Sequence, residues 1–199
     1  MKVLIACEES QVVCKAFRAK GHEAYSCDIL PCSGGHPEWH IQGDVLEQLD
    51  SGWDMMIAHP PCTYLCVAGL HYSKKDPTRM NKTEKAYEFF RKLYDSDIPK
   101  IAVENPVGIV STFFRKPDQI IDPFQFGQAE RKKTCLWLNG LPRLIPTTNL
   151  EVKPYKTIVR KTGRQAGKTY NYYWRQGKSA KERSKTFQGI ADAMASQWG

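Results

Sequence analysis

Residues 2–28 read KVLIACEESQVVCKAFRAKGHEAYSCD. The apolar run at 2–6 predicts a strand, which the polar residues 7–10 end. Apolar residues then recur at helical spacing from 12 to 21, and residues 22–27 predict a second strand. Strand, helix and strand in this order form a βαβ unit, and such units build parallel sheets.

Three more apolar runs, at residues 54–58, 98–103 and 135–138, predict further strands. Helical spacing recurs at residues 86–94 and in a closing helix near 186–198. The alternation of strands and helices predicts an α/β fold, and the length predicts a single domain over residues 1–199.

Two segments lack such periodicity. Residues 31–41 contain Pro, Gly, Ser and His, which predicts a loop, and residues 72–81 are polar, which predicts a mobile segment.

The composition excludes several classes of protein. No apolar run is long enough to span a membrane, so we expect a soluble, cytoplasmic protein with no membrane partner. The seven cysteines contain no Cys-x-x-Cys pair, which favours reduced thiols over disulfides or a zinc ribbon. Cys27, Cys32, His36 and His40 have spacings that could reach a zinc ion, but a loop with incidental side chains is favoured, and no metal is expected.

Positive charge is concentrated near the carboxyl end. Residues 151–185 contain eleven Lys and Arg residues against two acidic residues, and five aromatic side chains lie among them. Such a stretch suits phosphate contacts and base stacking. A solvated basic hairpin would have the same composition, so composition alone leaves both interpretations open.

Two motifs follow predicted strands. His59-Pro60-Pro61-Cys62 follows the strand at 54–58, and two prolines cannot continue a central strand. Glu104-Asn105-Pro106 follows the strand at 98–103. Open α/β sheets bind their ligands at the carboxyl ends of strands, so we expect Cys62 and Glu104 to lie close together there. Alone, each would suit a buried thiol or a solvated loop charge.

These motifs resemble those of the cytosine carbon-5 DNA methyltransferases, most closely the short phage-encoded members. Pro61-Cys62 resembles the family's nucleophile motif, Glu104-Asn105 its Glu-Asn motif, and residues 128–133 its basic motif. The resemblance implies a Rossmann-like S-adenosylmethionine-dependent methyltransferase fold. It also implies catalytic roles for Cys62, Glu104 and a cation, for which we rank Arg131 before Lys132 and Lys133.

Carbon 5 of cytosine is a poor nucleophile, which explains why these residue types are needed. A thiolate that adds to carbon 6 makes carbon 5 able to attack an alkyl sulfonium, and Cys62 is the expected thiolate. A carboxyl group that donates to ring nitrogen 3 neutralises the charge that develops, and Glu104 suits this role.

The resemblance also implies a site for S-adenosylmethionine, with Asp28 at the ribose and Asp44 at the adenine. The expected cofactor-binding residues are Cys7, Glu8, Asp28, Asp44, His59, Pro61 and Thr186. This chain has Cys7-Glu8-Glu9-Ser10 in place of the family's glycine-rich turn, and His59 where glycine is common. A modified cofactor such as carboxy-S-adenosylmethionine is an alternative, with His59 or a nearby lysine as donor to the extra carboxylate.

Full-length members carry a large target-recognition domain, whereas this chain has only residues 139–183, a reduced basic insert. We expect DNA to be the partner and no obligate protein partner. The expected DNA-binding residues are Lys132, Lys133, Arg160, Lys161, Arg164, Lys168 and Arg175. Two alternatives remain, an enzyme that modifies free deoxycytidine nucleotides and a non-catalytic DNA-binding protein on the same scaffold.

Overall fold

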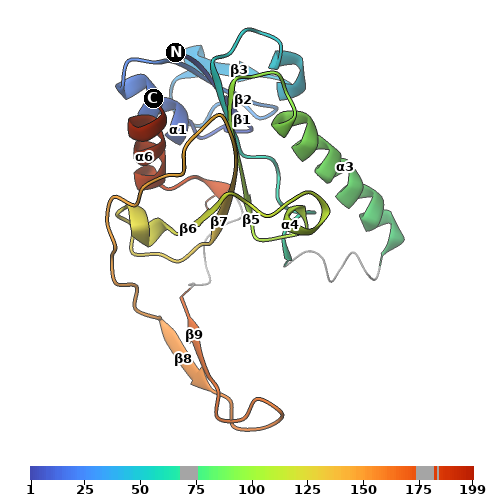
Figure 1. Ribbon diagram of the computed structural model, residues 1–199, viewed down its shortest axis with the longest axis vertical. Coiled ribbons are helices and arrows are strands. Elements are labelled where there is room, and N and C mark those ends of the chain that lie inside the picture. Colours follow the sequence, from blue (N-terminus) through green and yellow to red (C-terminus); the bar gives the residue numbers. More distant parts are fainter. Residues whose placement is uncertain (68–75, 174–181, 183) are drawn as a thin grey trace.

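The computed structural model describes residues 1–67, 76–173, 182 and 184–199 (Figure 1). The elements in chain order are β1 (Lys2–Ala6), α1 (Val12–Ala19), β2 (Glu23–Asp28), η1 (Pro37–Trp39), β3 (His40–Gln42), η2 (Val45–Gln48), β4 (Met55–Ala58), α3 (Pro77–Tyr94), β5 (Lys100–Pro106), α4 (Val110–Phe113), β6 (Gln119–Ile121), η3 (Pro123–Phe126), β7 (Thr134–Asn139), β8 (Lys156–Val159), β9 (Thr169–Tyr172) and α6 (Gln188–Trp198).

Within the described residues, the central sheet has seven strands in the order β3-β2-β1-β4-β5-β7-β6. Strands β1 to β5 are parallel, and β7 runs antiparallel to both β5 and β6. The order of strand addition reverses between β1 and β4, as in Rossmann-like sheets, which bind ligands at this switch point. The predicted α/β class and the first βαβ unit are confirmed.

Helices cover both faces of the sheet. In Figure 1, α1 and α6 lie on one side of the strands and α3 lies on the other. Phe17, Ile190 and Trp198 belong to the core on the α1 and α6 side, whereas Phe90 and Trp137 belong to the core on the α3 side. The strands between them are buried on both faces, which explains why β1 and β4 are continuous apolar runs.

The prediction of a mobile segment at 72–81 is wrong for its second half, because α3 begins at Pro77. The Asp76 side chain caps this helix by accepting hydrogen bonds from the Thr78 backbone N–H at 2.9 Å and from the Thr78 hydroxyl at 2.7 Å. Proline is well suited to a first helical position. The capping residues mark this helix start, whereas apolar periodicity appears only later. Residues 72–75 lie outside the described part of the chain.

The loop predicted at 31–41 is also wrong at its end, because residues 40–42 form the edge strand β3, paired with β2. His40 contacts the Ser26 hydroxyl at 2.8 Å, and the ring of His36 stacks on Trp39 with centroids 3.8 Å apart. The Cys32 thiol donates to Gln11. The side chains of the possible zinc cluster therefore have separate partners, and no group of three metal-ligating side chains converges within the described residues.

Strands β8 and β9 form a separate antiparallel hairpin. It projects from the end of the molecule that lies away from both chain termini (Figure 1). Nearly all of its side chains are exposed, so it contributes little to the core. None of the helices in the described segments has the length and apolar character needed to span a membrane.

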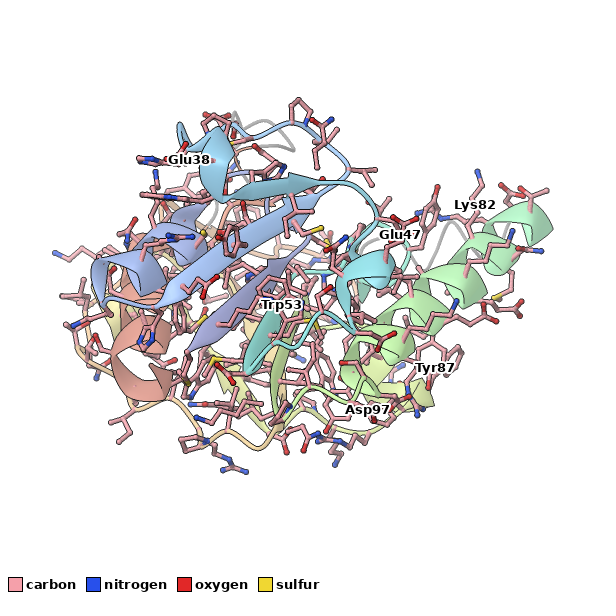
Figure 2. The ribbon with its side chains drawn as sticks, turned by 90° about the horizontal axis from the view of Figure 1, so that it is seen from above. Glu38, Glu47, Trp53, Lys82, Tyr87 and Asp97 are labelled. Carbon is pink, nitrogen blue, oxygen red and sulfur yellow. The ribbon has the colours of Figure 1, made fainter. Side chains whose placement is uncertain are left out.

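A hollow at the opposite end lies beside Trp53 and Asp97 (Figure 2). These residues precede β4 and β5, so this hollow is at the amino ends of the strands and far from the predicted motifs.

Candidate active site

Hydrogen bonds hold the loop that carries Cys62 at the carboxyl end of β4. The His59 backbone N–H donates to the Ala6 carbonyl at 2.9 Å, and the buried Asn105 amide donates to the Pro60 carbonyl at 2.9 Å. The Cys62 carbonyl accepts from the backbone N–H groups of Leu65 and Cys66, each at 3.0 Å. Asn105 thus couples the two motifs, and Cys62 is presented exposed on a fixed loop.

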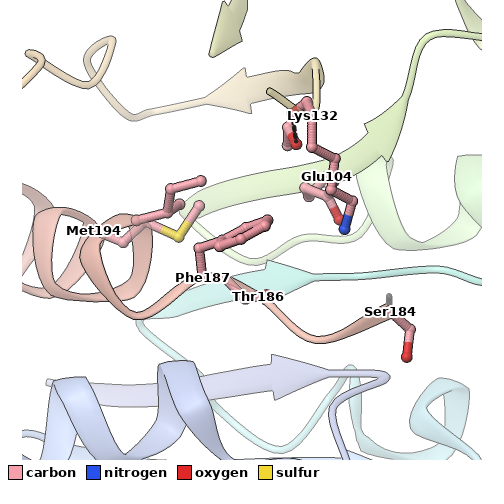
Figure 3. Close-up of a pocket in the computed structure, with 8 residues that line it drawn as sticks. Glu104, Lys132, Ser184, Thr186, Phe187 and Met194 are labelled. Atoms are coloured by element: carbon pink, nitrogen blue, oxygen red, sulfur yellow. Dashed lines mark hydrogen bonds between the residues drawn. The ribbon is translucent and has the colours of Figure 1, made fainter. Parts of the chain in front are cut away.

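Glu104 lies on β5 and lines a small pocket (Figure 3). The other lining residues are Lys132, Thr134, Ser184, Thr186, Phe187, Ile190 and Met194. The side chains of Glu104 and Lys132 point into the same space from neighbouring segments (Figure 3). The pocket therefore brings together the Glu-Asn motif, the basic motif and the segment that leads into α6.

The charges around Cys62 set the reactivity of its thiol. Withdrawal of the thiol from water raises the pKa of Cys62, and the neighbouring Cys66 and Glu104 raise it further. Lys132 acts in the opposite direction and lowers this pKa, because its positive charge stabilises the thiolate. Glu104 and Lys132 are therefore the charged groups that shift the pKa of Cys62.

Arg131 is the expected cation of the site, but Lys132 is the residue of the basic motif that lines the pocket with Glu104. The Arg131 guanidinium lies between two aromatic rings, 5.1 Å from the centroid of Phe124 and 4.7 Å from that of Tyr173. Lys133 is exposed.

The loop after β1 has an unusual conformation. Cys7 and Gln11 have positive φ angles of 60° and 58°, which glycine more commonly adopts. Gln11 is buried, and its side chain donates to the His36 carbonyl at 2.8 Å and accepts from the His36 backbone N–H at 3.1 Å. These bonds fix the loop before η1 against the start of α1 without a glycine-rich turn.

Glu8 does not face an open site. Its carboxylate accepts from the backbone N–H groups of Val13 at 2.8 Å and Cys14 at 3.2 Å, and it therefore caps α1. Burial raises the pKa of Glu8, against the opposing effects of His59 and of these backbone donors. An expected cofactor ligand is thus occupied within the protein.

Asp28 and Asp44 lie near each other around Cys7. Burial raises the pKa of Cys7, and both carboxylates raise it further, which places their charges close to this thiol. The Asp28 side chain accepts from the Leu30 backbone N–H at 2.9 Å, and Asp44 accepts from the Leu46 backbone N–H at 3.0 Å. Each aspartate uses one oxygen in a turn, so its other oxygen can accept a bond from a ligand.

His59 lies beside Glu104. Its Nδ1 is 3.4 Å from Oε2 of Glu104, and its Nε2 is buried with no hydrogen-bond partner among the described residues. The structure therefore turns one ring nitrogen toward Glu104 and encloses the other. Of the remaining expected cofactor residues, Pro61 is exposed beside Cys62 and Thr186 lines the pocket.

The expected DNA-binding residues of the insert lie in the hairpin. Arg160, Lys161, Arg164 and Lys168 are exposed at or near the turn between β8 and β9, and Arg175 lies outside the described residues. The Arg160 guanidinium is 5.7 Å from the ring centroid of Tyr170. These four cations thus belong to the segment that joins β8 to β9, in the hairpin that projects from the body of the protein (Figure 1).

Sequence reasoning missed the link between the basic motif and α6. The Gly189 backbone N–H donates to Oε1 of Gln128 at 3.2 Å, and a side chain at Gly189 would clash with the Phe126 carbonyl. A glycine near the start of a helix, where alanine is normally preferred, is the signal that could have indicated this close approach. Phe187 and Met194 of the pocket carried no comparable signal.

Comparison with known protein families and with curated proteins gives no match. Among solved structures, the chain is similar to a prophage-encoded E. coli protein described as a candidate DNA modification methyltransferase. The TM-score is 0.44 and the identity is 13%, over 76% of this chain and 52% of that chain. The chain thus spans about half the length of that protein.

Proposed function

We propose that this protein transfers a methyl group from S-adenosylmethionine to carbon 5 of cytosine in DNA through a covalent adduct at Cys62. The observation that carries the proposal is the shared environment of Cys62, Glu104 and Lys132 at the carboxyl ends of β4 and β5. A nucleophile, a proton donor and a cation meet there, as addition to a cytosine ring requires.

The reaction begins when the thiolate of Cys62 attacks carbon 6 of the cytosine. The electrons of the ring double bond move toward nitrogen 3, and Glu104 donates a proton to that nitrogen. S-adenosylmethionine would supply the methyl group on its sulfonium; carbon 5 would take this group as the bond between the methyl carbon and sulfur breaks, and S-adenosylhomocysteine would leave. Loss of the carbon-5 proton and cleavage of the bond between sulfur and carbon 6 restore the ring, and nitrogen 3 returns its proton to Glu104.

Lys132 has two roles in this proposal. Its charge lowers the pKa of Cys62 and so increases the fraction of thiolate. It lines the pocket with Glu104, and in this proposal its ammonium faces the oxygen of the ring. Because Arg131 is held between Phe124 and Tyr173, it supports the segment that carries Lys132 and does not contact the base.

The residues at the switch point fit S-adenosylmethionine. In a dinucleotide site, the helix after the first strand binds a phosphate at its N-terminus. Here Glu8 fills the N-terminus of α1, so a ligand phosphate would meet a carboxylate. S-adenosylmethionine has no phosphate and carries a positive sulfonium. Asp28 and Asp44 would hold its ribose and adenine, beside the exposed apolar side chains of Ile29 and Leu30.

The carboxylated form of the cofactor is less well supported. Its extra carboxylate requires a donor near the methyl group, and His59 or a nearby lysine is considered for this role. However, Nδ1 of His59 faces Glu104 and Nε2 is buried.

Methyl transfer from a labelled cofactor tests the proposal. We expect label to enter duplex DNA or single-stranded DNA and not free dCMP, and nuclease digestion should yield 5-methylcytosine. Transfer to dCMP alone would favour the nucleotide-modifying alternative. Absence of transfer to every substrate would contradict the enzymatic proposal.

Trapping on DNA that contains 5-fluorocytosine tests the nucleophile. We expect wild-type protein to form a stable adduct, because fluorine cannot leave as a proton does, and we expect Cys62→Ser to form none. Cys66→Ser is the matched control, since Cys66 lies in the same turn, and its adduct should persist. Because phosphate contacts dominate DNA affinity, Cys62→Ser should still bind DNA. An adduct that depends on Cys66 would reassign the nucleophile.

A further inference from the structure

Three titratable groups lie at three neighbouring strand ends. Glu8 follows β1, His59 follows β4 and Glu104 lies on β5, and these strands are adjacent in the sheet. The His59 side chain is 9% exposed and that of Glu104 is 21% exposed. The contact of 3.4 Å between His59 Nδ1 and Glu104 Oε2 is therefore largely shielded from water, where electrostatic contacts are stronger.

Glu8 is the second acidic residue whose charge acts with that of His59. Two backbone N–H groups of α1 fix its carboxylate, and its attraction to His59 opposes the effect of burial on the pKa of Glu8. The hydrogen-bond distance from the His59 ring is to Glu104, so Glu104 is the carboxyl group that the ring contacts directly.

The contacts also indicate which ring nitrogen carries the proton. Nδ1 faces a carboxylate oxygen, whereas Nε2 is buried without a hydrogen-bond partner in the described part of the chain. An orphaned buried N–H is rarer in proteins than an under-satisfied acceptor. The tautomer with hydrogen on Nδ1 satisfies this rule, and it donates to Glu104.

We infer that His59 is a positioning residue for Glu104, an inference that rests on the proposed function. The N–H of Nδ1 holds Oε2 of Glu104, so that Oε1 is the oxygen that faces the pocket and meets nitrogen 3 of the cytosine. A carboxyl group without this partner would rotate about its terminal bond and align less often with the ring. His59 acts through Glu104 and does not touch the substrate.

Substitutions that keep one ring nitrogen at a time test the inference. Asn in place of His59 puts its amide nitrogen near the position of Nδ1, whereas Gln reaches toward the position of Nε2. We expect His59→Ala and His59→Gln to lower kcat by about 10- to 100-fold, the size of a lost hydrogen bond to a charged group. The KM for DNA should stay within about threefold, since phosphate contacts dominate binding.

His59→Asn is the rescuing variant, and its kcat should return to within about fivefold of wild type. His36→Asn is the matched control, because His36 lies on the surface away from the site and its change should leave kcat unaltered. Equal activity of the Ala and Asn variants, at either a low or a wild-type level, would overturn the positioning role. A rise in KM with unchanged kcat would also overturn it.

A spectroscopic readout does not depend on turnover. The chain has five histidines, and comparison with His59→Asn assigns the ring resonances of His59. We expect Glu104→Gln to shift the ¹⁵Nδ1 resonance of His59, whereas Glu38→Gln, which alters the contact of His36, should leave it unchanged. An unshifted resonance in Glu104→Gln would overturn the inferred contact. Failure of methyl transfer by wild-type protein would instead contradict the proposed function.

Discussion

Cys62 differs from the other cysteines of the chain in its exposure and in its charged neighbours. Burial raises the pKa of Cys14 to about 12 and those of Cys27 and Cys135 to about 11, so these thiols stay protonated near neutral pH. Cys62 is exposed, and although its pKa is also raised, Lys132 lies close enough to lower it. The substrate can reach only a thiol of this kind.

Lys132→Gln should raise the pKa of Cys62, because it removes the cation that stabilises the thiolate. Alkylation of Cys62 by iodoacetamide, followed by mass spectrometry of the peptide, should then begin at higher pH than in wild type. Lys133→Gln is the matched control, since the charge of Lys133 lowers the pKa of Cys135 and not that of Cys62. An unchanged pH profile in Lys132→Gln would remove Lys132 from the site.

Asp28→Asn should weaken binding of S-adenosylhomocysteine by roughly tenfold, as expected for a lost hydrogen bond to a charged group. The asparagine oxygen can still accept from Leu30, so the turn is kept while the charge is lost. Isothermal titration calorimetry measures the effect. Asp50→Asn, at the opposite end of the sheet, should bind normally. Equal binding by both variants would exclude Asp28 from the cofactor site.

At the scale of elements, the docking of α6 decides the shape of the pocket. The helix packs against α1 in the core, and its first residues lie against Gln128 and the Phe126 carbonyl. Phe187, Ile190 and Met194 of this region line the pocket with Glu104. Gly189 permits the close approach, because any side chain there would meet backbone.

Gly189→Ala should lower the free energy of unfolding by about 2 kcal/mol through overpacking. Helix propensity alone predicts that the free energy of unfolding rises by about 1 kcal/mol. Urea denaturation measures this free energy and so distinguishes overpacking from helix propensity. Gly43→Ala is a suitable control, because a side chain there meets nothing within 4 Å. A stabilised Gly189→Ala protein would show that α6 does not dock as closely as the structure indicates.

At the scale of the whole molecule, the cations between β8 and β9 belong to a hairpin outside the central sheet, whereas Glu104 lies on β5 of that sheet. The hairpin projects from the same end of the molecule as the carboxyl ends of the parallel strands (Figure 1). The segment before it is anchored to η3, where Leu150 donates to the Phe124 carbonyl at 3.0 Å, and Tyr173 after it stacks on Arg131. A base that leaves the stack costs a few kcal/mol, so contacts along the DNA backbone must hold the substrate meanwhile.

Replacement of Arg160, Lys161, Arg164 and Lys168 by Gln should reduce the salt dependence of DNA binding. If each contacts one phosphate, the slope of log affinity against log salt should decrease in magnitude by about 3–4. The thermal midpoint should not change, because these side chains are exposed. Lys20→Gln with Lys92→Gln serves as a control on the body of the protein. An unaltered slope in the quadruple variant would show that the hairpin is only a solvated surface.

The sequence by itself determined the fold class and the two central motifs. Strands buried on both faces are continuous apolar runs, and the prolines before Cys62 end one of them, so local composition contained this information. The sequence did not predict β3, β6 or the start of α3. Short edge strands have weak apolar patterns, and the start of α3 depends on the cap at Asp76.

Only the tertiary structure decided which cation lines the pocket with Glu104 and what Glu8 and His59 contact. Arg131, Lys132 and Lys133 are three consecutive cations that the sequence does not distinguish. In the structure, the Arg131 guanidinium lies against the rings of Phe124 and Tyr173. Glu8 faces the N-terminus of α1, and His59 faces Glu104. These contacts join residues that are brought together only by the order of strands in the sheet, which local sequence patterns do not encode.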